Sequence, residues 1–274
     1  MKHLMKFAAS RGRDVCAPRA TEIWGHRGAS AYAPENTVAA FKMAIEMGAD
    51  GVELDIQLTN DNEVVVIHDE SIDRICGRKG NVRDYSFAEL KEFMDIPTLA
   101  EVLELISPTS LKVNVELKTG LIWYEGIENK AINLARQFNM MDRIIWSSFN
   151  HYSVQKVKEI EPSAETALLC GGGILITAKQ CKLSGADALH CDVNQMRYPG
   201  IIQDCHNHDI DIRAWTVDND DDLKFAYESG VDAVITNVID KAKDTRRVGA
   251  RFIAPYFNHS RADEDVRAPM AKIV

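Results

Sequence analysis

The feature that most constrains the fold is a regular alternation of short apolar runs with longer amphipathic stretches, which begins at Glu22 and continues to about Arg247. Runs such as GVELDIQL have the length and alternating polarity of strands, whereas PTLAEVLELI repeats its apolar residues at helical spacing. Strands that are each followed by a helix form parallel sheets, because parallel neighbours need a crossover connection. Eight such pairs, without a G-x-G-x-x-G after the first strand, predict an α/β protein with one closed (β/α)8 barrel.

The alternation also sets the predicted domain boundaries. No linker rich in Pro, Gly or Ser interrupts it, so residues 21–248 are predicted to form a single domain. Residues 1–20 form a basic leader without the apolar centre of a signal peptide, and residues 249–274 form a C-terminal tail. Residues 68–97 break the rhythm with a glycine- and charge-rich stretch, which predicts a short insertion after strand 2. An insertion there lies at the face where barrels place their active sites.

Charge limits which partners the protein is expected to bind, and cysteine content indicates its cellular compartment. The net charge of −9 argues against nucleic acid or an anionic membrane as the main partner, and any anionic ligand needs a locally positive site. No apolar run is long enough to form a transmembrane segment. The six cysteines show no C-x-x-C pair and no zinc-like spacing, so they are interpreted as reduced thiols of a cytoplasmic protein. The sequence leaves the oligomeric state open, a homo-oligomer included.

Acidic residues on two predicted strands indicate a cation site. Glu53 and Asp55 are two positions apart, so both side chains leave the same face of their strand. The same spacing groups Asn114, Glu116 and Lys118 on the inner face of the next barrel strand. Three carboxylates that converge at one end of a barrel favour a hard divalent cation, Mg²⁺ or Ca²⁺, over zinc. The alternative is that each acid is paired with a neighbouring base such as Lys118.

Two histidines follow strands next to this acidic site. His26 ends the first strand and His68 ends the short run EVVVIHD, and imidazole titrates near neutral pH, which suits general acid and base roles. Arg27 and Lys118 supply the local positive charge that a phosphodiester would need. Trp215, near the end of the seventh strand, is a candidate for the wall of the substrate pocket, with a place in the core as the alternative.

Three motifs occur in a familiar order: GHRGASAYAPENT, VELDIQLTNDNEVVVIHD and VNVELK. Together they resemble the glycerophosphodiester phosphodiesterase family, which has a phospholipase C-like TIM barrel. The resemblance covers about Glu22 to Arg247 and ends with the segments AWTVDN and AVITN. It implies that the catalytic residues are His26 and His68. It further implies that the metal ligands are Glu53, Asp55 and Glu116, and that Arg27 and Lys118 bind the phosphate. Glu35 and Asn36 match the P-E-N-T segment, which is expected to shape the loop.

The resemblance implies hydrolysis of glycerophosphodiesters, such as glycerophosphocholine and glycerophosphoethanolamine, to sn-glycerol 3-phosphate and an alcohol. One divalent cation, Mg²⁺ or Ca²⁺, would neutralise the phosphoryl oxygens, with His26 as general base and His68 as general acid. The nucleophile is water, or a glycerol hydroxyl of the substrate that first gives a cyclic phosphate. The segment before I-P-T-L is shorter than in many family members, which predicts a more open pocket and leaves the preferred alcohol undecided.

Three other interpretations are weaker. A lysophospholipase D-type enzyme on the same barrel needs a long apolar groove, which the sequence does not show. A catalytically silent barrel that binds a metabolite or partner would usually have lost a histidine or a ligand, and none is lost here. A metal-dependent sugar isomerase rests on fold analogy alone.

Overall fold

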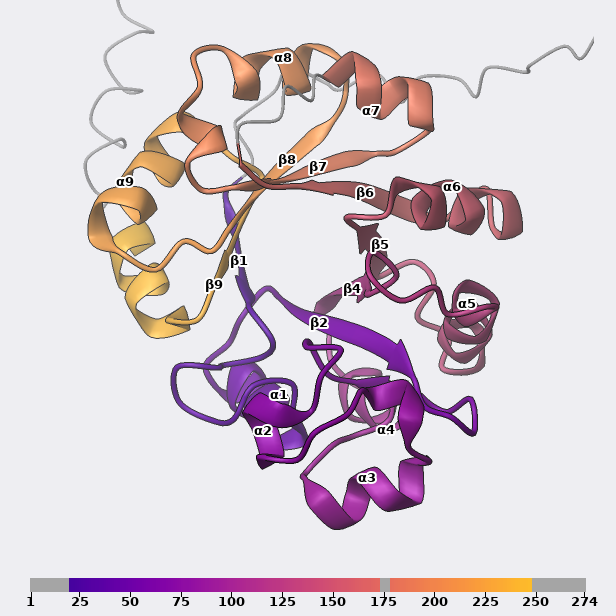
Figure 1. The fold of residues 1–274 in the computed structure, drawn as a ribbon. Coiled ribbons are helices and arrows are strands. Elements are labelled where there is room, and N and C mark those ends of the chain that lie inside the picture. Colours follow the sequence, from indigo (N-terminus) through magenta and orange to yellow (C-terminus); the bar gives the residue numbers. More distant parts are fainter. Residues whose placement is uncertain (1–19, 173–177, 248–274) are drawn as a thin grey trace, which may run out of the picture.

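The structure is a computed structural model that describes residues 20–172 and 178–247 (Figure 1). The predicted tail, and the predicted leader apart from residue 20, lie outside the described residues. The helices surround a set of strands that run through the centre of the molecule. The boundaries of the predicted domain therefore stay a prediction, while its architecture can be compared directly.

Eight parallel strands close into a barrel, as the alternation predicted. Their order is β1-β9-β8-β7-β6-β5-β4-β2, and a pairing between β1 and β2 completes the ring. The strands are β1 (Glu22–Gly25), β2 (Gly51–Leu58), β4 (Lys112–Leu117), β5 (Ile144–Ser148), β6 (Glu165–Cys170), β7 (Ala188–Asp192), β8 (Asp211–Trp215) and β9 (Ala233–Thr236). The single (β/α)8 barrel is thus confirmed.

Amphipathic helices cover the outside of the barrel (Figure 1). They are α1 (Val38–Glu46), α4 (Leu99–Ile106), α5 (Ile127–Gln137), α6 (His151–Ile160), α7 (Ala178–Ser184), α8 (Ile201–Asn207) and α9 (Asp220–Ser229), and residues 239–247 are also helical. A short 3-10 helix, η2 (Gln195–Arg197), precedes α8. The predicted helix after Pro97 shows how the sequence defines these boundaries. Thr98 and Glu101 form a capping box, and Leu99, Val102, Leu103 and Ile106 are buried against the sheet.

The insertion after strand 2 is a small unit with its own apolar centre. It contains β3 (Val64–Val66), which pairs antiparallel with the end of β2, followed by α2 (Asp73–Cys76), the 3-10 helix η1 (Val82–Asp84) and α3 (Phe87–Phe93). Six buried apolar residues hold it together: Val65, Ile67, Ile72, Val82, Leu90 and Ile96. Because it follows the carboxyl end of β2, the insertion brings His68 to the predicted face.

The barrel interior differs between its two ends. Four strands begin with a charged residue, namely Glu22, Lys112, Glu165 and Asp211. Lys112 pairs with Glu22 at 2.6 Å, and Arg213, further along β8, pairs with both Glu165 and Asp211. Above them, Trp24, Ile145 and small residues of β6, β7 and β9 form a buried apolar layer. Paired charges and packed side chains therefore close the amino end of the barrel. The candidate site lies at the opposite, carboxyl end.

Candidate active site

Three carboxylates converge at the carboxyl end of β2 and β4. Asp55 stands opposite Glu116 in the parallel register, and Glu53 lies two residues before Asp55 on the same face. One oxygen from each of the three lies within 4.8 Å of the others, and all three side chains are buried. The structure thus brings together the acids that the strand spacing had predicted to share a site.

The proximity of these acids perturbs their ionisation. Burial, followed by the charges of Asp55 and Glu116, raises the pKa of Glu53 well above its ordinary value. Burial and the charge of Asp55 raise the pKa of Glu116 to about 7. Burial also acts to raise the pKa of Asp55, but Lys118, His68 and Arg27 together lower it below its ordinary value. The cluster therefore carries more negative charge than its basic neighbours offset, and it favours a proton or a cation.

The donor set of this cluster fits a hard divalent cation. Asp55 Oδ1 and Asn114 Oδ1 are buried and have no hydrogen-bond partner among the described residues. Asn114 stands opposite Glu53 in the register and lines the same pocket. Oxygen donors alone suit Mg²⁺ or Ca²⁺. Sequence spacing had placed Asn114 on the inner face but had given it no role.

Each of the two histidines is held through its Nδ1 atom. His26 Nδ1 lies 2.8 Å from Asn237 Oδ1, and its Nε2 lies 3.9 Å from Glu53 Oε2. Burial and then the charge of Arg27 lower the pKa of His26 below its ordinary value. His68 Nδ1 instead lies 2.6 Å from Asp69 Oδ1. Both imidazoles line the pocket, as the sequence predicted.

The two predicted basic residues lie among the carboxylates. Arg27 Nε is 3.6 Å from Asp55 Oδ2, and the backbone N–H of Arg27 donates to Glu53 at 2.8 Å. Lys118 Nζ lies 2.9 Å from Glu116 and 3.8 Å from Asp55. The Nε of Arg27 is buried without a hydrogen-bond partner among the described residues, so it has a donor to spare for an anion. The locally positive groups that an acidic protein needs are therefore present.

The turn after β1 places His26 and Arg27 close to the acids. Arg27 has a left-handed backbone with φ of 55°, and Gly28 follows with φ of 81°. A Cβ at Gly28 would lie 2.7 Å from the carbonyl carbon of Ala40, so only glycine fits there. In the P-E-N-T segment, Asn36 Nδ2 donates to Asp55 Oδ2 at 2.9 Å and so orients this acid.

A pocket of about 60 Å³ joins these groups. Its polar lining comes from both histidines, Arg27, Glu53, Asn114 and Glu116, and its apolar lining from Phe149, Leu169, Trp215 and Ile235. Trp215 lines the pocket and also packs on the apolar layer of the barrel, while its contact with substrate stays a prediction. Its ring meets that of Phe149 edge-on, with centroids 5.6 Å apart.

Several residues of the site were not predicted. Asp69 binds His68 and also Arg74 Nε at 2.5 Å, while Arg74 Nη2 reaches Glu35 at 2.6 Å. Asn237 follows β9 and contacts His26, which follows β1, where these two strands pair. Phe149 follows β5. The only signal in the sequence is position, since each follows a strand of the sheet or, for Arg74, lies in the insertion.

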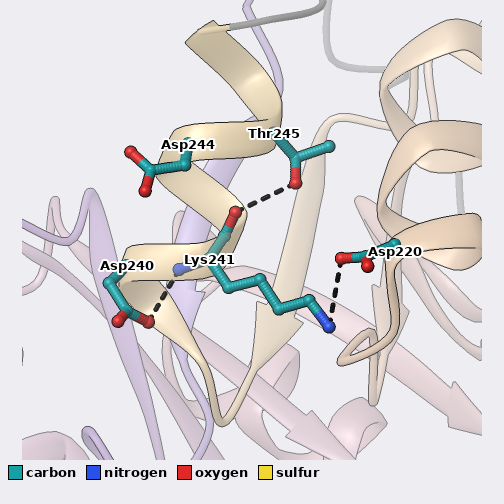
Figure 2. A pocket seen from close by; sticks show the side chains of 5 residues that line it. All are labelled: Asp220, Asp240, Lys241, Asp244 and Thr245. Atoms are coloured by element: carbon teal, nitrogen blue, oxygen red, sulfur yellow. Dashed lines mark hydrogen bonds and ion pairs between the residues drawn. The ribbon is translucent and has the colours of Figure 1, made fainter.

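A larger surface hollow lies elsewhere, between the start of α9 and the helix of residues 239–247 (Figure 2). Its volume is about 460 Å³, and it is lined by Asp220, Asp240, Lys241, Asp244 and Thr245. Lys241 pairs with Asp220 at 3.1 Å, and Thr245 donates to the backbone of Lys241. These are ordinary surface interactions of charged side chains. The smaller pocket, where buried ionisable groups converge, is the site.

Fold and site together define a class. A closed (β/α)8 barrel with buried carboxylates, two histidines and two basic side chains at its carboxyl end is typical of barrel enzymes that act on anionic substrates with a bound cation. Residues 26–241 match the model of the glycerophosphoryl diester phosphodiesterase family. The chain belongs to this family, and it is accordingly an enzyme, a phosphoric diester hydrolase.

Individual relatives agree with this assignment. A glycerophosphodiester phosphodiesterase of Caldanaerobacter subterraneus subsp. tengcongensis is 39% identical over 229 residues, which cover 79% of this chain and 94% of the relative. The structure of a glycerophosphodiester phosphodiesterase from Agrobacterium tumefaciens is 28% identical, with a TM-score of 0.70 over 81% of this chain and 98% of that one. A phosphodiesterase of Oleispira antarctica, solved with its product sn-glycerol-3-phosphate, is 24% identical with a TM-score of 0.69, covering 82% and 96% of the two chains.

Proposed function

We propose that the protein hydrolyses glycerophosphodiesters such as glycerophosphocholine and glycerophosphoethanolamine to sn-glycerol 3-phosphate and an alcohol. The observation that carries this proposal is that Glu53 and Glu116 of the carboxylate cluster line one pocket together with His26 and His68. The Oleispira relative supports the identity of the product, because its structure holds sn-glycerol-3-phosphate on the same fold.

Glu53, Asp55 and Glu116 are the proposed ligands of one divalent cation, Mg²⁺ or Ca²⁺. The unpartnered oxygens of Asp55 and Asn114 support this assignment, because buried oxygens without hydrogen bonds are costly unless a cation or water satisfies them. When bound, the cation supplies positive charge that offsets the charge of the phosphoryl oxygens. Arg27 and Lys118, which both lie within 4 Å of Asp55, add to this positive charge and steady the phosphodiester.

We assign the proton transfers to the two histidines. His26 takes the proton of the nucleophile at Nε2, because its Nδ1 is engaged by Asn237. His68 donates a proton to the departing alcohol, while Asp69 holds its Nδ1 at 2.6 Å. The nucleophile is water or a hydroxyl of the substrate's own glycerol, and the second route passes through a cyclic phosphate. Either route uses the same base and acid.

A release assay tests the proposal. Purified protein is incubated with glycerophosphocholine and excess Mg²⁺ or Ca²⁺, and glycerol 3-phosphate is detected with a coupled enzyme. We expect release that depends on enzyme and cation. Production of glycerol and phosphocholine instead would place the cleaved bond on the other side of the phosphorus and refute the proposed products.

An observation favours a second substrate class, the lysophospholipids. Leu121 and Trp123 follow β4, Tyr152 is the second residue of α6, and their exposed fractions are 84%, 56% and 76%. The two loops are joined by a hydrogen bond from Asn150 Nδ2 to the carbonyl of Thr119 at 3.1 Å. Phe149, which follows β5, is also exposed and lines the pocket. These four exposed residues (Leu121, Trp123, Phe149 and Tyr152) are called the apolar rim below. An acyl chain on the substrate would find apolar surface there.

The cellular setting remains a proposal. No helix among the described residues is both long and apolar enough to cross a membrane. The five described cysteines are free, and Cys170, Cys181, Cys191 and Cys205 are buried. We propose a cytoplasmic location, since thiols stay reduced there. Fractionation of cells followed by immunodetection would test it.

A further inference from the structure

Three neighbouring barrel strands, β8, β9 and β1, end in residues that bind one another. Asp218 follows β8, Asn237 follows β9 and His26 follows β1. Asp218 Oδ1 accepts hydrogen bonds from Thr236 Oγ1 at 2.9 Å and from the backbone N–H of Asn237 at 2.8 Å. Asp218 Oδ2 accepts from Asn237 Nδ2 at 2.6 Å. The carboxylate is thus held by two bonds that do not depend on the Asn237 side chain.

This carboxylate determines which way the Asn237 amide faces. A carboxylate only accepts hydrogen bonds, so the end of the amide that faces Asp218 must be the NH₂ group. The carbonyl end, Oδ1, then faces His26 Nδ1 at 2.8 Å and also accepts from Ser30 Oγ at 2.6 Å. Because an amide oxygen also only accepts, the hydrogen between Asn237 and His26 must reside on Nδ1 of His26.

The consequence for His26 is a defined tautomer. With Nδ1 protonated, the lone pair of neutral His26 lies on Nε2, the atom nearest Glu53 at 3.9 Å. If the Asn237 amide were reversed, its NH₂ group would face Nδ1, the proton would move to Nε2, and Nε2 could no longer accept one. His68 needs no such relay, because its Nδ1 meets a carboxylate directly.

We infer that Asp218 and Asn237 are positioning residues that hold His26 as the Nδ1-protonated tautomer, so that Nε2 accepts the proton of the nucleophile. This inference rests on the proposed function for the role of His26. What matters is that a hydrogen-bond acceptor, fixed by its partner at position 218, faces His26 Nδ1, rather than the identity of each residue. That property makes a swap experiment possible.

The swap uses D218N, N237D and the double variant D218N/N237D. In D218N, the backbone N–H of Asn237 still needs an oxygen at residue 218, so the new NH₂ group faces Asn237 and favours the reversed amide. In N237D, two carboxylates face each other. We expect kcat to fall on the order of tenfold or more at similar KM in both single variants. In the double variant, the amide now at position 218 donates to the carboxylate now at position 237. That carboxylate accepts from His26 Nδ1, so the acceptor that faces Nδ1 is restored, although the bond between positions 218 and 237 now runs in the opposite direction. We therefore expect kcat to recover to within about threefold of the parent. N133D, an exposed Asn-to-Asp change on α5, is the matched control and should match the parent.

Two readouts separate positioning from general damage and from the proposed reaction. Calorimetry with Mg²⁺ alone should give similar affinity in all variants, because neither residue is a proposed ligand. Nitrogen-15 NMR of the imidazoles, with the His26 signal assigned by loss in H26Q, should show Nδ1-protonated His26 in the parent and a mixed population in N237L. Parent kcat in both single variants, or a double variant no better than the worse single one, would overturn the inference, as would Nε2-protonated His26 in the parent. Absence of hydrolysis by the parent would refute the proposed function instead, while the NMR result would still decide the tautomer.

Discussion

At the scale of single residues, the two histidines differ in what holds them. An amide relay holds His26, and the carboxylate of Asp69 holds His68. Burial acts to raise the pKa of Asp69, but its bonds to Arg74 and His68 lower it to about 2. Asp69 therefore stays ionised near neutral pH, and it remains an acceptor for His68 throughout the working range. The difference between the two partners suits a base and an acid.

The roles of the histidines lead to the first prediction. Replacement of either one by alanine should lower turnover on the order of 10² to 10⁴, the range of general acid–base catalysis. With p-nitrophenolate as leaving group, departure needs little proton donation, so His68→Ala should recover much of its activity while His26→Ala stays slow. Steady-state kinetics with both substrates measures this. Recovery of the His26 variant instead would reverse the two roles.

The second prediction concerns the cation. Chelation with EDTA should abolish activity, and Mg²⁺ or Ca²⁺ should restore it, because the proposed ligands are all oxygens. Glu53→Gln should weaken cation binding by calorimetry, since it removes one ligand charge at nearly constant size. Glu128, also buried but bonded to Ser153 and Lys156 outside the pocket, offers the control Glu128→Gln, which should keep the parent affinity. Full activity in EDTA would refute the metal assignment.

The third prediction is a pH dependence with a definite sign. The pKa of Glu116 is raised to about 7 in the folded protein, above an unfolded value of about 4.3, so its protonated form is favoured by folding. In cation-free protein, that contribution to stability is present below the unfolded pKa and is lost as pH rises through about 7. A divalent cation competes with this proton. The rise in melting temperature on adding Mg²⁺ should therefore be larger at pH 8 than at pH 5.5, and an equal rise would contradict the assignment.

At the scale of elements, the insertion after β2 is joined to the β1–α1 loop by one arginine. Arg74 of α2 binds Glu35 in that loop and Asp69 beside His68, and Glu35 in turn binds Arg27 at 3.0 Å. The arginine side chain is 49% exposed, so its ion pairs contribute little to the free energy of folding. Its effect is on the relative position of the two histidine-bearing segments.

The fourth prediction follows from this bridge. Arg74→Met should lower kcat/KM by roughly tenfold through misplacement of His68 and Arg27, with little change in melting temperature. Arg83→Met, an exposed arginine of the same insertion, is the matched control and should behave as the parent. Kinetics and thermal unfolding on the same samples separate the two effects. An Arg74 variant with unchanged kinetics would show that the bridge does not position the site.

Some residues of the site could be predicted from local strand spacing, and others could not. Period-two spacing along β2 and β4 was enough to place Glu53, Asp55 and Glu116 on one face, because alternation is a local property of any strand. Asn237 could not be predicted in this way, because its contact with His26 depends on barrel closure, which places β9 next to β1. Asp69 was visible in the sequence, but its bond to His68 depends on the path of the insertion.

At the scale of the whole molecule, the apolar rim offers a way to distinguish the two candidate substrate classes by experiment. Glycerophosphocholine and glycerophosphoethanolamine should be cleaved with modest discrimination, because we expect the pocket to recognise mainly the glycerophosphate half. The fifth prediction is that a triple change of Leu121, Trp123 and Tyr152 to serine leaves these rates unchanged and lowers only the rate with lysophosphatidylcholine. Parallel assays measure the ratio. Cleavage of lysophosphatidylcholine much faster than glycerophosphocholine in the parent would favour the lysophospholipase D assignment.

The closure of the barrel determines how late during synthesis the site can be completed. His26 and Asn237 are 211 positions apart, whereas the carboxylates lie within the first half of the sequence. A polypeptide still emerging from the ribosome can therefore present its acidic ligands long before its base has been oriented. If His26 is the base, as proposed, hydrolysis requires the last strand to have joined the first, because that pairing places Asn237 beside His26. We therefore expect activity to appear only once the barrel has closed, so that activity would report a complete fold.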